Sequence, residues 1–303
     1  MTTTDLGPAA AATRPPPPKA KAGLPKIDFT RPAGEAALFG PDSVAWQVYD
    51  NPVSLFIGGS TAVLLELAEP RVRSGVWDHT SFRTDPLPRM KRTGLAAMVT
   101  VYAARSTAEA MIAGVGRMHG RVEGVTPAGQ PYRASDQELL DWVQATAGFG
   151  FLEAYSTFVR PVSNADRDRF YAEGAPAAAL YGAAGAPRSH SELEAQFMAM
   201  RPKLERSEIV FEFLDIVRRA PIFPAPLRPL QRMLIRASVE ITPAWVREIL
   251  GLDATYGLRP GEAAIIRGMA ALAEKAPNFA NPSAQACRRL GLPANYLRTL
   301  RAL

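Results

Sequence analysis

The chain has 303 residues, of which 47% are hydrophobic and 21% charged, a composition that is typical of a globular protein and excludes disorder for most of the length. The arginines that give the formal net charge of +6 are spread along the chain, which suits a carboxylate-bearing cofactor and does not favour nucleic acid as a partner. The single cysteine, Cys287, excludes an intrachain disulfide and a metal site built from several cysteines, and it suits a reducing compartment.

The first residues are rich in proline, alanine and lysine, and we expect a disordered tail at residues 1–28 followed by one domain at residues 29–303. The tail has no continuous apolar segment and no twin arginine, which predicts a cytoplasmic protein without a secretory signal. The most apolar stretch, residues 52–65, is shorter than the roughly 20 residues of a membrane span. Because Glu66 and Glu69 follow it directly, we expect a buried helix there and no transmembrane segment.

Helical periodicity recurs from there to the end, and no stretch alternates for long as a half-buried strand would, which predicts an all-α fold. Pro70 should divide the first long helix. Asp85 followed by Pro86 predicts the start of another helix. The next predicted helix begins at residues 106–107 and ends at Gly124.

A predicted loop at residues 124–134 separates these helices from a further long helix. Ser135 and Glu138 have the spacing of a capping box at the start of that helix. Later helices are predicted at residues 163–173, 191–206 and 208–219, followed by amphipathic stretches to the C-terminus.

The chain has three histidines, His79, His119 and His190, and their spacing matches no zinc-binding helix. A lone histidine on an apolar helix face is more often a core residue than a ligand. Such a face is predicted around His119, where the helical spacing places it beside Met111, Ile112, Val115 and Val122.

Two features favour a bound group near this face. Gly114 and Gly116 have no side chains and lie in the helix of His119, so that a flat group could approach this helix closely. The preceding helix carries Arg89, Arg92 and Thr93 at offsets of three and four residues, so they share one face. The alternative is that these arginines are the solvated first turn of that helix.

Four segments that occur in order resemble the family of latex-clearing proteins and MpaB-type oxygenases: ELAEPRVRSGVWDHTSF, PLPRMKRTG, RMHGRVEG and PYRASDQELLDWVQAT. The similarity covers roughly residues 35–260. It implies haem b in a globin-like helical core, with His119 of the MHxxV element as the proximal iron ligand. It also implies a distal side that carries Arg89, Arg92 and Thr93, and it makes His79 the second candidate ligand.

The chain departs from the family pattern at two positions. Arg92 stands where the RxxKT element has lysine, and a guanidinium is a poor iron ligand because it stays protonated. This favours an open or water-bound distal site, or an arginine that hydrogen-bonds a propionate or bound oxygen. Gln144 stands where many relatives have histidine.

The resemblance implies a haem-dependent oxygenase or oxidoreductase that uses O2 or peroxide, with Arg92 and Thr93 as catalytic residues and oxidative cleavage of a C=C bond as the expected reaction. We expect a small hydrophobic substrate, isoprenoid-like or a natural product, because an enzyme that degrades rubber should carry an export signal. A non-catalytic haem sensor or carrier is one alternative, favoured by Arg92 and Gln144. An all-α nucleic-acid or partner-binding module without haem is the other, favoured by the basic pI. The motifs leave the substrate and the oligomeric state open.

Overall fold

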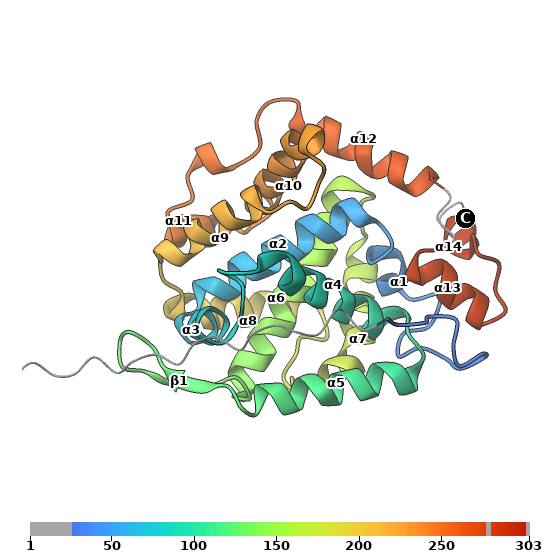
Figure 1. Ribbon diagram of the computed structural model, residues 1–303, viewed down its shortest axis with the longest axis horizontal. Helices are drawn as coiled ribbons and strands as arrows, with labels where there is room; N and C mark the ends of the chain where they lie inside the picture. Colours follow the sequence, from blue (N-terminus) through green and yellow to red (C-terminus); the bar gives the residue numbers. More distant parts are fainter. Residues whose placement is uncertain (1–25, 277–279, 301–303) are drawn as a thin grey trace, which may run out of the picture.

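Two long helices, α2 (Pro52–Ala68) and α6 (Gln137–Phe158), cross at the centre of the molecule (Figure 1). The computed structural model describes residues 26–276 and 280–300, so the predicted tail lies, up to residue 25, outside the described residues. Apolar side chains occur all round α2, and most of them are buried. This is the pattern expected of a helix that other helices cover on all sides.

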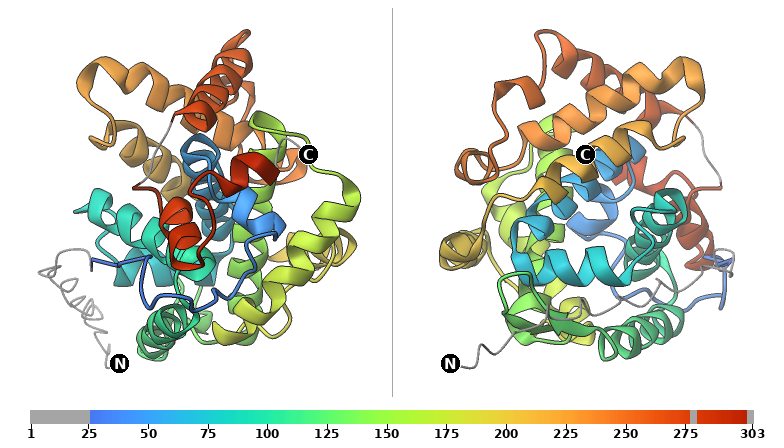
Figure 2. Two further views of the ribbon diagram at one scale, coloured as in Figure 1. Left: turned by 90° about the vertical axis from the view of Figure 1, so that its right-hand side faces the viewer. Right: turned by 60° about the vertical axis from the view of Figure 1, so that its left-hand side comes forward.

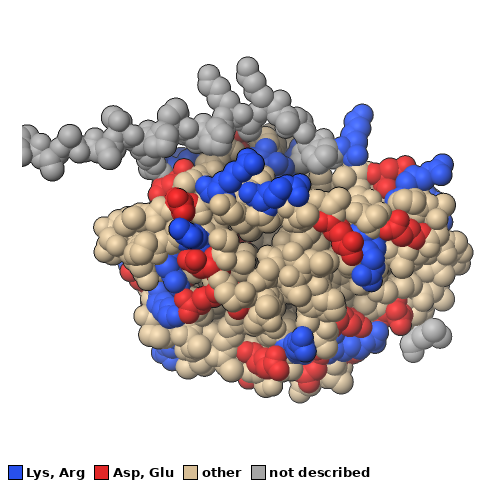
Figure 3. Space-filling view, turned by 90° about the horizontal axis from the view of Figure 1, so that it is seen from below, with Lys and Arg blue, Asp and Glu red and all other residues tan. Residues whose placement is uncertain are grey.

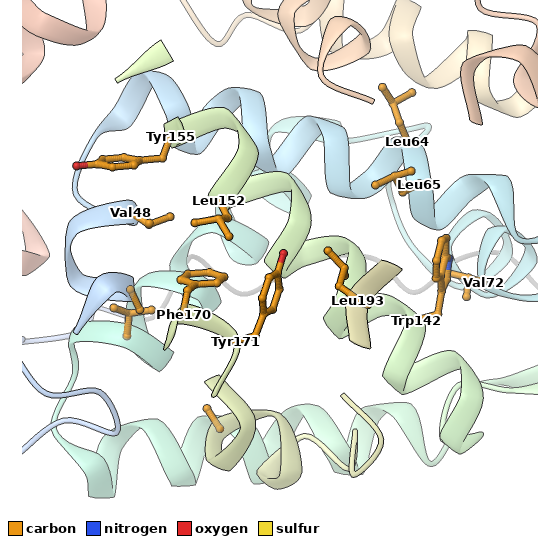
Figure 4. Close-up of a cluster of buried hydrophobic side chains, with 14 of the residues drawn as sticks. Val48, Leu64, Leu65, Val72, Trp142, Leu152, Tyr155, Phe170, Tyr171 and Leu193 are labelled. Carbon is orange, nitrogen blue, oxygen red and sulfur yellow. The ribbon is translucent and has the colours of Figure 1, made fainter. Parts of the chain in front are cut away.

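The close approach of α2 and α6 depends on glycine. A Cβ atom on Gly58 would lie 2.7 Å from the carbonyl oxygen of Gly150, so the two backbones touch where neither residue has a side chain. Figure 4 shows a cluster of buried hydrophobic side chains, several of which come from these two helices. They include Leu64 and Leu65 from α2 and Leu152 from α6, all of them fully buried.

Helices from both halves of the chain surround the central pair (Figures 1 and 2). In all views α5 lies on the side of the molecule opposite to α10 and α12, which pack against α2. Seen from the α5 side, the surface carries charges of both signs near its edges and a wide uncharged area between them (Figure 3). The surrounding helices are α1 (Val44–Val48), α3 (Pro70–His79), α4 (Pro86–Tyr102), α5 (Arg105–His119), α7 (Asn164–Leu180), α8 (His190–Met200), α9 (Glu208–Arg219), α10 (Arg228–Glu240), α11 (Ala244–Leu250), α12 (Glu262–Lys275), α13 (Pro282–Arg289) and α14 (Tyr296–Leu300).

The fold is all-α, as the sequence predicts. Pro70 divides the first long helix as expected, and α2 and α3 meet at 111°. Helix α4 begins at Pro86, and α9 has the predicted bounds. Among the described residues, no single helix is long and apolar enough to cross a membrane, although α2 and α3 together meet the same criteria as one bent pair.

The segment between α5 and α6 differs from the prediction in two respects. The predicted loop contains a small antiparallel sheet of β1 (Glu123–Val125) and β2 (Pro131–Arg133). Gly129, with a φ of +82°, makes the turn between these strands. The preceding helix ends at His119 and not at Gly124, because the carbonyl of Val122 accepts a hydrogen bond from Ala134 beside the sheet.

Candidate functional site

Helices α2, α4 and α5 bring four ionisable side chains into one cluster: Glu66, Arg89, Arg92 and His119. Arg89 is at its centre, since its charge acts on the pKa of Glu66 and of His119. The pKa of Arg89 in turn responds to Glu66 and to Arg92. Residues separated by up to 53 positions in the sequence are therefore electrostatic neighbours in the fold.

The arginine side of the cluster is built by the first turns of α4. Arg89 donates from its guanidinium to the hydroxyl of Thr93, and that hydroxyl donates to the Arg89 carbonyl at 3.1 Å. Arg89 and Thr93 thus share one helix face, as predicted, and contact each other at the i,i+4 spacing. Arg92 reaches only Ser81, with an Nη2 to Oγ distance of 3.5 Å at the outer limit of a hydrogen bond.

His119 is the last residue of α5 and is half-buried. Ala108 and Ile112 are buried on the inner face of this helix, and Met111 and Val115 are half-buried there. The predicted apolar face is therefore present, except that Val122 lies beyond the helix end. A Cβ atom added to Gly114 or Gly116 would meet no other element within 4 Å, so these glycines do not mark a close contact inside the described structure.

The imidazole of His119 is in the state that suits a metal ligand. Burial, and secondarily the positive charge of Arg89, lower its pKa below the ordinary value, so the ring is neutral at neutral pH. Within the described residues the ring has no hydrogen-bond partner. A neutral imidazole with a free nitrogen is a ready donor to iron.

Glu66 is a member of the cluster that the sequence did not predict as a site residue. Burial raises the pKa of its carboxyl to about 7, although the charge of Arg89 opposes this shift. Such a group carries and releases a proton near neutral pH. The signal in the sequence was a glutamate at the end of the most apolar helix, where an ionised carboxylate is costly.

Glu66 and Arg89 also share an unusual environment. Both side chains keep some solvent-accessible surface, yet desolvation is the largest influence on the pKa of each. Both ionisable groups are therefore largely removed from water although neither side chain is fully covered.

The other two histidines have different surroundings. Nε2 of His79 lies 3.2 Å from the hydroxyl of Tyr132 in β2, and the two rings meet edge to face. His79 therefore has a hydrogen-bond partner in the protein, unlike His119. His190 begins α8, and its Nε2 lies 3.6 Å from Glu194, in the next turn of the same helix.

Gln144 lines a separate cavity of about 40 Å³ in which none of the four clustered side chains takes part. Its neighbours there include Tyr49 and Tyr171, and the buried hydroxyl of Tyr171 has no hydrogen-bond partner. The two departures from the family pattern, Arg92 and Gln144, thus lie in different places.

The cluster fits a porphyrin better than a bare metal ion. Among residues 26–276 and 280–300, no three His, Cys, Asp or Glu side chains form a metal-binding group. A haem iron needs only one or two protein donors, which His119 alone can supply. Arg89 and Arg92 are suited to pair with the carboxylates of a porphyrin. Burial raises the pKa of Cys287 to about 11, so its thiol is not ionised at neutral pH.

Comparison with known proteins places the chain in a family. Residues 46–275 match the family described as ER-bound oxygenase mpaB/B′/Rubber oxygenase, catalytic domain, and this match includes all four residues of the cluster. No curated protein and no solved structure matches the chain. Because the match extends over about three quarters of the sequence, the chain belongs to the mpaB and rubber oxygenase catalytic-domain family.

Proposed function

We propose that this oxygenase-family protein depends on haem b, that His119 is the protein ligand of its iron, and that it oxidises a small hydrophobic substrate. The main support for the proposal is that the neutral imidazole of His119, which has no hydrogen-bond partner in the described structure, lies in one cluster with two arginines and with a carboxyl that titrates near pH 7. A bound haem b would supply an iron centre that activates O2 or peroxide.

The arginines have two roles in this proposal. Arg89 holds Glu66 in place by charge attraction, and its contact with Thr93 fixes the guanidinium along α4. Arg92, which has only a weak contact with Ser81, is available to pair with a propionate. Since a guanidinium keeps its proton, Arg92 donates hydrogen bonds and does not compete with His119 for iron.

Glu66 is the proposed acid–base group. With a pKa of about 7 it is present in both protonation states at neutral pH, so it can accept a proton from the substrate or return one. The hydroxyl of Thr93, bonded to Arg89, is the second polar group on this side. We therefore add Glu66 to Arg92 and Thr93 as a proposed catalytic residue.

A haem-binding sensor or carrier is the second candidate function. Arg92 in the lysine position of the family motif favours it, because this change alters the distal side of the site. Both candidates share the ligand His119 but differ in turnover.

Oxygen consumption separates the two candidates. We expect haem-loaded protein to consume O2 in the presence of isoprenoid alkenes, and we expect Glu66→Gln to lower the rate at least tenfold while the haem content stays unchanged. Glu109→Gln, on the exposed face of α5, is the matched control. Haem-loaded protein that consumes neither O2 nor added peroxide with any of these alkenes would support the carrier and contradict the oxygenase.

A further inference from the structure

A pocket lined only by arginine lies among the C-terminal helices, far from α5 (Figure 1). It is open to solvent, has a volume of about 470 Å³, and lies between the end of α9, one face of α10 and the loop before α12. A volume of this size is typical of a small-molecule site. The lining residues are Arg218, Arg219, Arg228, Arg232, Arg236 and Arg259.

The carboxylates around the pocket do not balance these charges. Asp215 forms ion pairs with Arg218 and Arg219. Glu262 accepts hydrogen bonds from the Arg236 guanidinium through both carboxylate oxygens. The backbone N–H of Arg259 also donates to Glu262 and helps to lower the pKa of this carboxyl. Within the described residues no other carboxylate contacts the six arginines, so an excess of four positive charges remains.

Two of the arginines that form no ion pair, Arg228 and Arg232, lie on α10 together with the paired Arg236. Arg228, Arg232 and Arg236 follow one another at intervals of four residues and share a helix face, where like charges destabilise the helix. Arg228 is also the first residue of α10, at the helix end that carries positive charge and disfavours cations. Arg228 and Arg232 are exposed and have no ion pair in the described structure. Folding alone gives no reason for this arrangement.

A second hollow of about 900 Å³ continues from the pocket and shares five of its arginines. Its wall includes the apolar side chains of Phe211, Ile235 and Val239 and the ring of Tyr256, and on the side of α9 the carboxylates of Glu208, Glu212 and Asp215. A ligand with a highly charged end and a less polar body would have contacts for both parts.

We propose that the arginine pocket binds a soluble ligand that carries two or more adjacent phosphate groups. Planar guanidinium groups bind phosphate oxygens in pairs, which favours phosphate over halide or a single carboxylate. Two phosphate groups carry roughly three to four negative charges at neutral pH, which matches the excess of four. A concave site suits such a ligand better than the flat surface of a membrane does. The proposal does not depend on haem or on His119.

Titration calorimetry of the full chain with inorganic diphosphate tests this proposal. We expect the double variant Arg228→Gln/Arg232→Gln to bind diphosphate at least tenfold more weakly than the wild type. The control is Arg188→Gln/Arg288→Gln, which removes the same charge at exposed positions outside the pocket and should change the affinity less than twofold. Wild type that binds no diphosphate, or two doubles with equal losses, would overturn the proposal.

Two further measurements make the outcome decisive. Thermal unfolding should show Arg188→Gln/Arg288→Gln at the wild-type midpoint and Arg228→Gln/Arg232→Gln at or above it, since none of the four side chains forms an ion pair in the described structure and the second double removes like charges from α10. Sedimentation with phosphatidic acid vesicles, against phosphatidylcholine vesicles, distinguishes a lipid headgroup from a free ligand. Vesicle binding that needs Arg228 and Arg232, without any binding of free diphosphate, would also overturn the proposal.

Discussion

At the residue scale, the site depends on how burial changes proton affinities. Glu66 and His119 both respond to the same influences, desolvation and the charge of Arg89, but with different results. Desolvation favours the neutral form of each group, so it raises the pKa of the carboxyl and lowers that of the imidazole. The cluster thus combines a neutral nitrogen donor with a carboxyl that still holds a proton near pH 7.

The raised pKa of Glu66 predicts a pH dependence of stability. The carboxyl binds its proton more tightly in the folded state, so folding stability falls as pH rises from the ordinary value of 4.5 to about 7 and then levels off. We expect Glu66→Gln to remove this fall, with a gain relative to wild type of up to roughly 3 kcal/mol between pH 5 and pH 8. Urea unfolding at four pH values measures it. Parallel profiles for the two proteins would contradict the raised pKa.

The position of Arg89 on α4 predicts that Arg89 and the nearby Lys91 differ in their effect on haem binding. Arg89 faces the cluster, whereas the exposed Lys91 points about 200° away around the helix. We expect Arg89→Ala to lose most of its haem on gel filtration and Lys91→Ala to keep it. Equal haem content in both variants would remove Arg89 from the cofactor site.

The sequence identified most of these residues, but through different kinds of signal. His119, Arg89 and Arg92 occupy motifs that resemble a family, and local helix geometry places Arg89 and Thr93 on one face. Glu66 was not identified as a site residue because its role depends on the approach of Arg89, a residue 23 positions later in the chain, which no local pattern contains. The arginine pocket was also missed, since its residues come from three separate segments.

At the element scale, the sequence predicts the start of a helix correctly where local residues restrict the backbone and no tertiary contact overrides them. Pro70 and Pro86 restrict the backbone itself, so the helix boundaries that they predict are correct. The capping box predicted at Ser135 and Glu138 is wrong, because Asp136 is the N-cap residue of α6. Glu138 instead forms ion pairs with Arg71 and Lys203, two partners distant in the sequence.

The crossing of α2 and α6 gives a sharp test of packing. We expect Gly58→Ala to destabilise the protein by at least about 2 kcal/mol, because the new Cβ would lie 2.7 Å from the backbone oxygen of Gly150. Gly59→Ala is the matched control on the same helix: its Cβ would meet only the Phe151 ring at 3.7 Å, and alanine favours the helix. Equal urea midpoints for the two variants would contradict the close contact.

At the scale of the whole molecule, residues outside the family match complete the core. Phe29 and Phe39 before the match and Leu297 after it are buried in the main core. The two flanks also bind each other, since the buried guanidinium of Arg289 donates to the carbonyls of Phe29 and Glu35 at 2.7 and 2.8 Å. That residues 29–303 form a single domain stays a prediction.

Arg289 therefore should matter to the stability of the entire chain. We expect Arg289→Met to lower the free energy of unfolding by roughly 2–4 kcal/mol, because it leaves two carbonyl groups without their donor. Arg288→Met changes an exposed neighbour and should cost less than about 0.5 kcal/mol. Urea denaturation compares them, and a similar loss in both variants would show that the flanks do not depend on this contact.

The absorption spectrum of His119→Ala, produced with a haem precursor, tests the central claim most directly. We expect the wild type, His79→Ala and His190→Ala to show a Soret band, and His119→Ala to lose it or to bind haem weakly, because burial lowers the pKa of His119 and its ring has neither a hydrogen-bond nor an ion-pair partner in the described structure. Added imidazole should restore part of the band by filling the vacated position. A His119→Ala protein that binds one haem per chain with an unaltered ferric spectrum would contradict the assignment.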